Sequence, residues 1–263
     1  MDATSPHVQE PAVPGASGKY LDLGAFYRPI PPEEAEKMRR LFAAYRREYA
    51  RAYDMLHAAR LVSPGGISGV LTAEAKARVR KRAEAFAEKA VRRSEAEYEK
   101  RRFLSAYTCR GAVLLSATAA SFGRVCTLDN ELGLADDFLQ AVLERARSAG
   151  AARIVCPDPV DPEKLTALIL PEDGLSLVAV SGDFRFDGKA ARHFRLDTAA
   201  ELSDAKRKEV RRAAALRRSL AAEACSALRR AKELHDELEA VYHPFVDFRA
   251  LTRFEQKHLE KVF

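Results

Sequence analysis

A polar loop within residues 125–136 follows a short apolar run and precedes an amphipathic stretch, the position at which many nucleotide-binding folds hold phosphates. There the pattern Gly-x-x-x-x-Gly-Lys-Ser/Thr supplies backbone N–H groups, a lysine that neutralises charge and a hydroxyl that binds magnesium. Of this pattern the loop retains only the second glycine, Gly133. Leu128 stands in place of the first glycine, Leu134 in place of the lysine and Ala135 in place of the hydroxyl residue. The sequence therefore predicts the shape of a phosphate-binding loop without the side chains that hold a nucleotide.

The same loop carries two acids, Asp129 and Glu131, where a polyphosphate would lie. Like charges at that range, at an effective dielectric of about 20, repel by on the order of several kcal/mol. Carboxylates in front of a helix also cap its N-terminus and complement its dipole, and we expect this role for both acids rather than phosphate or metal chemistry. The whole degenerate loop comprises Leu128, Asp129, Asn130, Glu131, Leu132, Gly133, Leu134 and Ala135. We expect no catalytic residue, no metal and no cofactor, with ATP-Mg as the ligand if the loop still binds nucleotide.

Further acids lie among three prolines in residues 155–165, just past a predicted strand. Ligands of open α/β sheets bind outside the carboxyl ends of strands, so Asp158 and Asp161 could bind magnesium. Asx-Pro turns explain both acids as well, and we favour turns here and for the carboxylates of residues 171–173. The scattered histidines lack the spacing of a metal site. The four cysteines are also widely spaced, and we expect them to be buried free thiols.

Short apolar runs and one amphipathic helix surround these loops. Strands are predicted at residues 112–115, 125–128, 152–156, 165–170 and 175–180. A helix is predicted at residues 134–149, closed by Gly150. The order strand, helix, strand is that of a βαβ unit, which predicts an α/β domain with a parallel sheet.

Long helices flank this region on both sides. Residues 1–31 are rich in proline and predict extended or loop structure. The apolar periodicity predicts helices over 32–62, over 72–102 with Thr72 as the N-cap, from beyond 197 to about 242, and over 248–263.

The chain has 263 residues, with 44 basic and 38 acidic side chains, a formal charge of +6. No stretch approaches the roughly 18–20 apolar residues that a membrane span needs, so we expect no membrane partner and a cytoplasmic location. Residues 71–102 are strongly basic, which permits nucleic-acid binding. A solvated helix in an antiparallel pair is the preferred interpretation.

Several short motifs, taken in order, resemble one family. They lie at residues 101–111, 155–165, 168–175 and 230–248. These stretches are similar to the second repeat of a prokaryotic family of tandem-repeat ATPases in the P-loop NTPase superfamily, in which a P-loop α/β domain precedes a long helical hairpin. The stretches 2–8, 14–16 and 21–26 resemble the end of that family's first α/β domain. The resemblance implies that the chain begins near the end of repeat one and lacks the first P-loop.

The resemblance implies a P-loop NTPase-like three-layer parallel sheet with long flanking helical hairpins. The expected parts are 1–31, a remnant of the first repeat; 32–100, a helical hairpin; 101–198, the degenerate P-loop domain; and 199–263, a second hairpin. The expected function is that of an ATPase-family protein with a degenerate nucleotide-binding loop, which binds or regulates without hydrolysing nucleotide. An ATPase completed by a partner chain and a basic helical adaptor for protein or nucleic acid stay open as alternatives. Self-association through helices 32–102 is expected, because their apolar stripe needs a cover.

Overall fold

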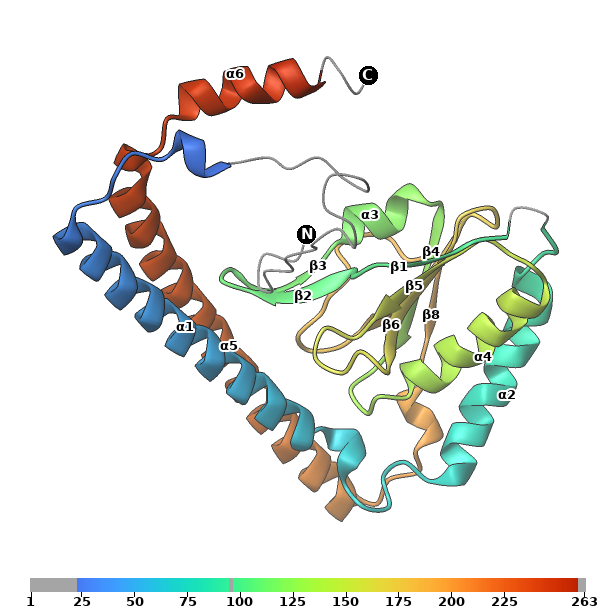
Figure 1. The fold of residues 1–263 in the computed structure, drawn as a ribbon. Helices are drawn as coiled ribbons and strands as arrows, with labels where there is room; N and C mark the ends of the chain where they lie inside the picture. Colours follow the sequence, from blue (N-terminus) through green and yellow to red (C-terminus); the bar gives the residue numbers. More distant parts are fainter. Residues whose placement is uncertain (1–22, 95–96, 260–263) are drawn as a thin grey trace, which may run out of the picture. The chain divides into compact units, whose positions relative to one another are not determined.

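The computed structural model describes residues 23–94 and 97–259, which divide into two units (Figure 1). The larger unit, Ala44–Glu233, is a mixed α/β domain with helices on its flanks. The smaller unit joins the described residues up to Ala43 to those from Leu234 onward. Most of the predicted extended segment 1–31 therefore lies outside the described residues.

A six-stranded sheet forms the centre of the larger unit. Its strands, in spatial order, are β1 (Glu99–Arg101), β5 (Arg153–Pro157), β6 (Leu165–Leu170), β7 (Leu175–Val180), β4 (Arg124–Asp129) and β8 (Arg192–Phe194). The pairs β1–β5, β7–β4 and β4–β8 are parallel. The five strands predicted from apolar runs are all present, four of them in this sheet, whereas β1 and β8 were not predicted.

The prediction of a parallel sheet is confirmed in part, because β6 runs antiparallel to both β5 and β7. The connections before and after β6, residues 158–164 and 171–174, are too short for a crossover. Parallel neighbours need a connection of roughly a dozen residues or more, whereas antiparallel neighbours need only a tight turn. The sheet is therefore mixed and mostly parallel in strand direction, with a local β5–β6–β7 meander at its centre.

Two layers cover the faces of this sheet. On one face, α4 (Ala135–Ser148) packs between the sheet and α2 (Ala73–Ala90), with Phe138 fully buried in the shared core. The other face is covered by α3 (Ser116–Ser121) and by a separate hairpin of β2 (Ser105–Thr108) and β3 (Gly111–Leu114). The predicted Gly150 terminus is confirmed, because Gly150 and Ala151 donate hydrogen bonds back to the last turn of α4.

Two long helices pair on the flank of the larger unit. They are α1 (Pro32–Leu61) and α5 (Asp204–Tyr242). Within this unit, Ala52 and Leu56 of α1 pack against Ala224 and Ala227 of α5, and the two helices run antiparallel (Figure 1). None of the described helices combines the length and the apolar character that crossing a membrane requires.

The smaller unit is held by a short backbone exchange between its two segments. The 3₁₀ turn η1 (Leu23–Phe26) lies beside η4 (His243–Phe245) and α6 (Phe248–Leu259). The N–H of Asp247 donates to the Phe26 carbonyl oxygen at 2.8 Å, and the rings of Phe26 and Phe254 meet edge to face at 5.2 Å.

The predicted helix over 72–102 is correct at its start and wrong at its end. The Thr72 hydroxyl accepts a hydrogen bond from the N–H of Ala75 at 3.2 Å, as an N-cap does. The helix stops at Ala90, and Val91 is extended and buried. The backbone N–H groups of Arg92 and Ser94 then donate to distant residues, so periodicity and charge within the segment could not reveal the end.

Edge strand β1 is fixed to its neighbours by one carboxylate. The Glu99 carboxylate accepts hydrogen bonds from Arg147 of α4 at 2.7 and 2.9 Å and from Arg153 of β5 at 2.7 Å. Arg153 is only 6% exposed, and Glu99 is the closer of its two carboxylate partners, because Glu97 lies at 3.5 Å. The two guanidinium groups lower the pKa of Glu99 to about 2.

We expect Glu99→Gln to lower the free energy of unfolding by about 1–3 kcal/mol, because it leaves the buried Arg153 without its closest carboxylate. Because the pKa of Glu99 is lowered in the fold, the difference in unfolding free energy between wild type and this variant should be largest above pH ~5. It should shrink as the pH falls toward ~2. Urea unfolding at several pH values measures it. Glu84→Gln, which breaks only the exposed pair with Arg80, should change stability by less than about 0.5 kcal/mol. Equal effects of the two substitutions would contradict the role of Glu99.

Candidate functional site

A cavity of about 120 Å³ lies at the carboxyl ends of β4 and β7. Its walls come from the loop after β4, the loop after β5, the β2–β3 hairpin, the end of α1 and Arg217 of α5. This edge of the sheet is where α/β folds hold ligands. The predicted loop thus contributes to a cavity that also needs elements distant in the sequence.

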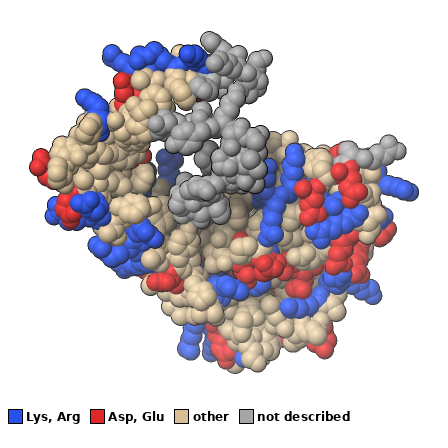
Figure 2. Space-filling view, viewed as in Figure 1, with Lys and Arg blue, Asp and Glu red and all other residues tan. Residues whose placement is uncertain are grey.

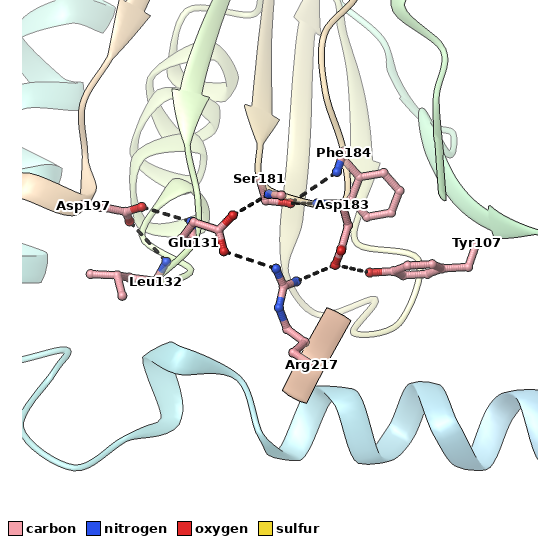
Figure 3. A network of polar contacts seen from close by, with 9 residues as sticks. Tyr107, Glu131, Leu132, Ser181, Asp183, Phe184, Asp197 and Arg217 are labelled. Atoms are coloured by element: carbon pink, nitrogen blue, oxygen red, sulfur yellow. Dashed lines mark hydrogen bonds and ion pairs between the residues drawn. The ribbon is translucent and has the colours of Figure 1, made fainter. Parts of the chain in front are cut away.

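The loop after β4 is tied to the loop after β8 by a reciprocal exchange of hydrogen bonds. The Asp197 carboxylate accepts the N–H groups of Glu131 at 3.0 Å and Leu132 at 3.2 Å (Figure 3). In return, the Asp129 carboxylate accepts the N–H groups of Leu196 and Asp197, the latter at 3.1 Å. Backbone N–H groups of this loop, which would surround a phosphate in a nucleotide-binding protein, are therefore bonded to an internal carboxylate.

The positions that replace the lysine and hydroxyl residues point away from any ligand. Leu134 and Ala135 are 0% exposed and belong to the core between the sheet and α4, as does Leu128. Gly133 adopts a φ of 86°, a left-handed conformation that favours glycine, and lines the cavity. Of the loop positions that the pattern specifies, Gly133 alone faces the site.

The prediction that Asp129 and Glu131 cap the following helix is wrong. Asn130 provides the contact instead, and its side-chain oxygen accepts the N–H of Ala135 at 3.0 Å. Both acids turn toward other loops, because amides from distant segments reach them at the edge of the sheet. Glu131 accepts the N–H of Gly182.

A network centred on Arg217 crosses the cavity wall and was not predicted from the sequence (Figure 3). The Arg217 guanidinium lies 3.1 Å from the Asp183 carboxylate and 3.4 Å from the Glu131 carboxylate. The Tyr107 hydroxyl donates to Asp183 at 3.1 Å, and burial together with that carboxylate raises the pKa of Tyr107. These residues come from four separate segments, so spacing along the chain carries no sign of their meeting.

The acids after β5 form the turn that the sequence analysis favoured. One Asp158 carboxylate oxygen accepts the N–H groups of Val160 at 2.8 Å and Asp161 at 2.9 Å, and burial raises the pKa of Asp158. Asp161 lies 3.2 Å from Arg60 of α1 and 3.6 Å from Lys164. Both carboxylates already have partners within the protein.

The Ser105 hydroxyl in the cavity wall has no hydrogen-bond partner among the described residues. Ser105 is only 3% exposed, and its buried hydroxyl group neither donates nor accepts a hydrogen bond. Ser105 lies at the start of β2 and lines the cavity. A buried hydroxyl of this kind is normally satisfied by a water molecule or a ligand.

The described residues bring together one group of potential metal ligands, elsewhere on α5. Ligand atoms of His235, Asp236 and Glu239 all lie within 4.8 Å of one another. They share successive turns of one helix at its surface, and the sequence analysis assigned the histidines no metal role. Side chains at this spacing on an exposed helix meet whether or not an ion binds.

Fold and site together define a mixed α/β domain whose strand–loop–helix junction is closed by the protein's own carboxylates. No protein-family model matches the chain, and no curated protein or solved structure shows significant similarity to it.

The turn between α1 and α2 presses on the loop, which leads to a steric prediction. A side chain on Gly65 would place its Cβ 2.0 Å from the Leu132 carbonyl oxygen, whereas a Cβ on Gly66 would meet nothing closer than 4.0 Å. We expect Gly65→Ala to lower the free energy of unfolding by about 1–3 kcal/mol or more, because backbone atoms must move. Gly66→Ala should leave it unchanged or raise it slightly, because alanine restricts the unfolded chain. Chemical unfolding measures both, and similar stability of the two variants would contradict this packing.

The exchange between Asp129 and Asp197 also predicts a pH dependence. Burial, followed by repulsion from Asp129, raises the pKa of Asp197 to about 6. A carboxyl group whose pKa is raised in the folded state stabilises that state at low pH. This contribution is lost as the pH rises from ~4 through ~6. We expect the stability of wild type relative to Asp197→Asn to fall across that interval by up to about 3 kcal/mol, as two pKa units imply. Urea unfolding of both proteins at matched pH values measures this, and parallel pH profiles would contradict it.

Proposed function

We propose that this chain is a P-loop-like α/β protein that acts by binding and does not hydrolyse nucleotide. The observation that carries this proposal is the Asp197 carboxylate on the N–H groups of Glu131 and Leu132. An anion of the protein thus occupies donors that a nucleotide phosphate would need. A phosphate entering the loop would have to displace Asp197 and then lie beside Asp129 and Glu131.

The size and lining of the cavity support the same proposal. Small-molecule sites usually measure about 300–1,000 Å³, so a cavity of about 120 Å³ is too small for a nucleoside triphosphate. The lining contains four acids, Glu131, Asp136, Asp158 and Asp161, and its three cations, Arg60, Lys164 and Arg217, already pair with two of these acids. The cavity, with the unpartnered Ser105 hydroxyl, suits a water molecule or a small polar ligand rather than a polyphosphate.

Resemblance to the tandem-repeat P-loop ATPases fits this proposal. The junction of β4 and α4 retains the glycine with positive φ but lacks lysine and hydroxyl side chains facing the site. An ATPase completed by a partner chain would need that partner to supply a cation and to free the loop amides from Asp197. Self-association through helices 32–102 stays part of the proposal, and Phe42, Tyr53 and Leu61 of α1 are exposed.

We expect millimolar ATP-Mg to leave the melting temperature unchanged. A ligand at 100 times its dissociation constant adds about 2.7 kcal/mol of stability, which shifts melting by roughly 5–10 °C in a domain of this size. Differential scanning fluorimetry at about 0.3 M salt, where exposed charges are screened, measures this, with magnesium alone as the control. A rise of several degrees with ATP-Mg would show that the loop binds nucleotide and would overturn the proposal.

A further inference from the structure

A second depression lies at the opposite, amino end of β4 and β8. This basic groove has a volume of about 330 Å³ and is lined by Arg82, Ala85, Phe86, Lys89, Ala90, Arg124, Arg192 and Phe194. Arg124 and Arg192 are the first residues of β4 and β8, and the other two cations project from α2. All eight residues belong to the larger unit.

None of the four cations of the basic groove forms an ion pair with a carboxylate of the described residues. Elsewhere on this unit, basic and acidic side chains intermix (Figure 2), and Arg78 and Arg80 of the same helix α2 pair with Glu201 and Glu144. In the groove, the Arg82 guanidinium donates only to the Arg195 carbonyl oxygen, at 3.0 Å. Four cations gathered without an acid repel one another, which an incoming anion would relieve.

One acid that interacts with a cation of the groove is already hydrogen-bonded elsewhere. Asp173 interacts electrostatically with Arg124 and Arg92, but its carboxylate accepts the backbone N–H of Arg92 at 3.2 Å. It does not line the groove, and neither does any other acidic residue that the structure describes. The groove therefore keeps a local charge of one sign.

An aromatic floor holds two of the cations in place. The Arg192 guanidinium lies 4.3 Å from the centre of the Phe194 ring, and that of Arg82 lies 5.3 Å from it. Phe194 is 1% exposed and packs against Phe86 at 5.2 Å and Phe138 at 4.9 Å, so the ring is fixed. Cation–π contacts orient the guanidinium groups before a ligand arrives, which lowers the entropy lost on binding.

We propose that the basic groove binds the phosphate backbone of a nucleic acid without sequence preference. Its cations come from three elements, and exposed Arg92, Arg93 and Arg195 follow α2 and β8 along the chain, which suits a ligand with several phosphates in a row. Its lining contains no Asn, Gln, Ser, Thr, Tyr or His side chain, so its polar groups are all Arg and Lys, the side chains that neutralise phosphates. This inference does not rest on the proposed function, because the two sites lie at opposite ends of the strands.

The test is fluorescence anisotropy with a labelled RNA of mixed sequence and about 20 nucleotides, titrated at several salt concentrations. We expect binding that weakens linearly on a log–log plot against salt. Lys89→Ala/Arg192→Ala should reduce affinity at low salt by about 10-fold or more and lower the salt slope by about 2, because two phosphate contacts are lost. No binding by the wild-type chain would overturn the proposal.

The matched control is Lys208→Ala/Arg212→Ala, which removes the same charge from exposed positions on α5 outside the groove. This control should bind RNA within about 2-fold of wild type at each salt concentration. An equal loss in both double variants would mean that net charge, and not the groove, attracts RNA, and would overturn the proposal.

The length of the ligand is tested as well. If the longer RNA binds no more tightly than a dinucleotide, and equimolar tripolyphosphate competes fully, the groove is a small-anion site and the nucleic-acid proposal is overturned. Melting temperatures of both variants show whether each is folded. Because ATP-Mg is tested at the loop and RNA at the groove, either proposal can fail alone.

Discussion

The carboxylates of Asp129 and Asp197 each accept two backbone N–H groups from the loop that carries the other. This exchange joins the carboxyl ends of β4 and β8 after their ladder has ended. It satisfies four backbone donors that would otherwise need water, and it sets the path of the loop that leads into α4. The same exchange brings two carboxylates close together, so the protein accepts electrostatic repulsion in return for a closed loop.

The elements around the site depend on that closed loop. Leu132 is buried beneath the turn that ends α1, where Gly65 leaves no room for a side chain. Glu131 extends the contact to Gly182 and Arg217, which brings α5 to the edge of the sheet. The cavity is thus a result of several tight contacts on one loop rather than a space left between independent layers.

The sequence predicted local features well because their causes are local. Apolar runs located the strands at residues 165–170 and 175–180, and the Thr72 cap and Gly150 terminus follow from chemistry within one turn. It did not predict the edge strands β1 and β8. Each has three residues, largely exposed, and is held by partners far along the chain. The antiparallel direction of β6 could have been predicted from the sequence, because the short connections on either side exclude a crossover.

The candidate site was predictable only in part, for the same reason. The strand–loop–helix junction and the absence of a lysine and hydroxyl residue are visible in the sequence, and the turn at Asp158 follows from its prolines. The partners of Asp129 and Glu131 are not visible, because each lies more than 50 residues away along the chain. A carboxylate next to a helix accepts a hydrogen bond from whichever backbone amide the fold brings close to it. The order of residues in the sequence does not show which amide that is.

The β5–β6–β7 meander has a consequence for how the chain folds. Its two ladders close over the short connections 158–164 and 171–174, so they lose little chain entropy when they form. Pairing of β4 with β7 must instead close a long loop that contains α4, β5 and β6. We therefore expect the meander to form first and to present the edge of β7 as a template for β4. The site at the carboxyl edge can assemble only after that late, non-local step, since its loop follows β4.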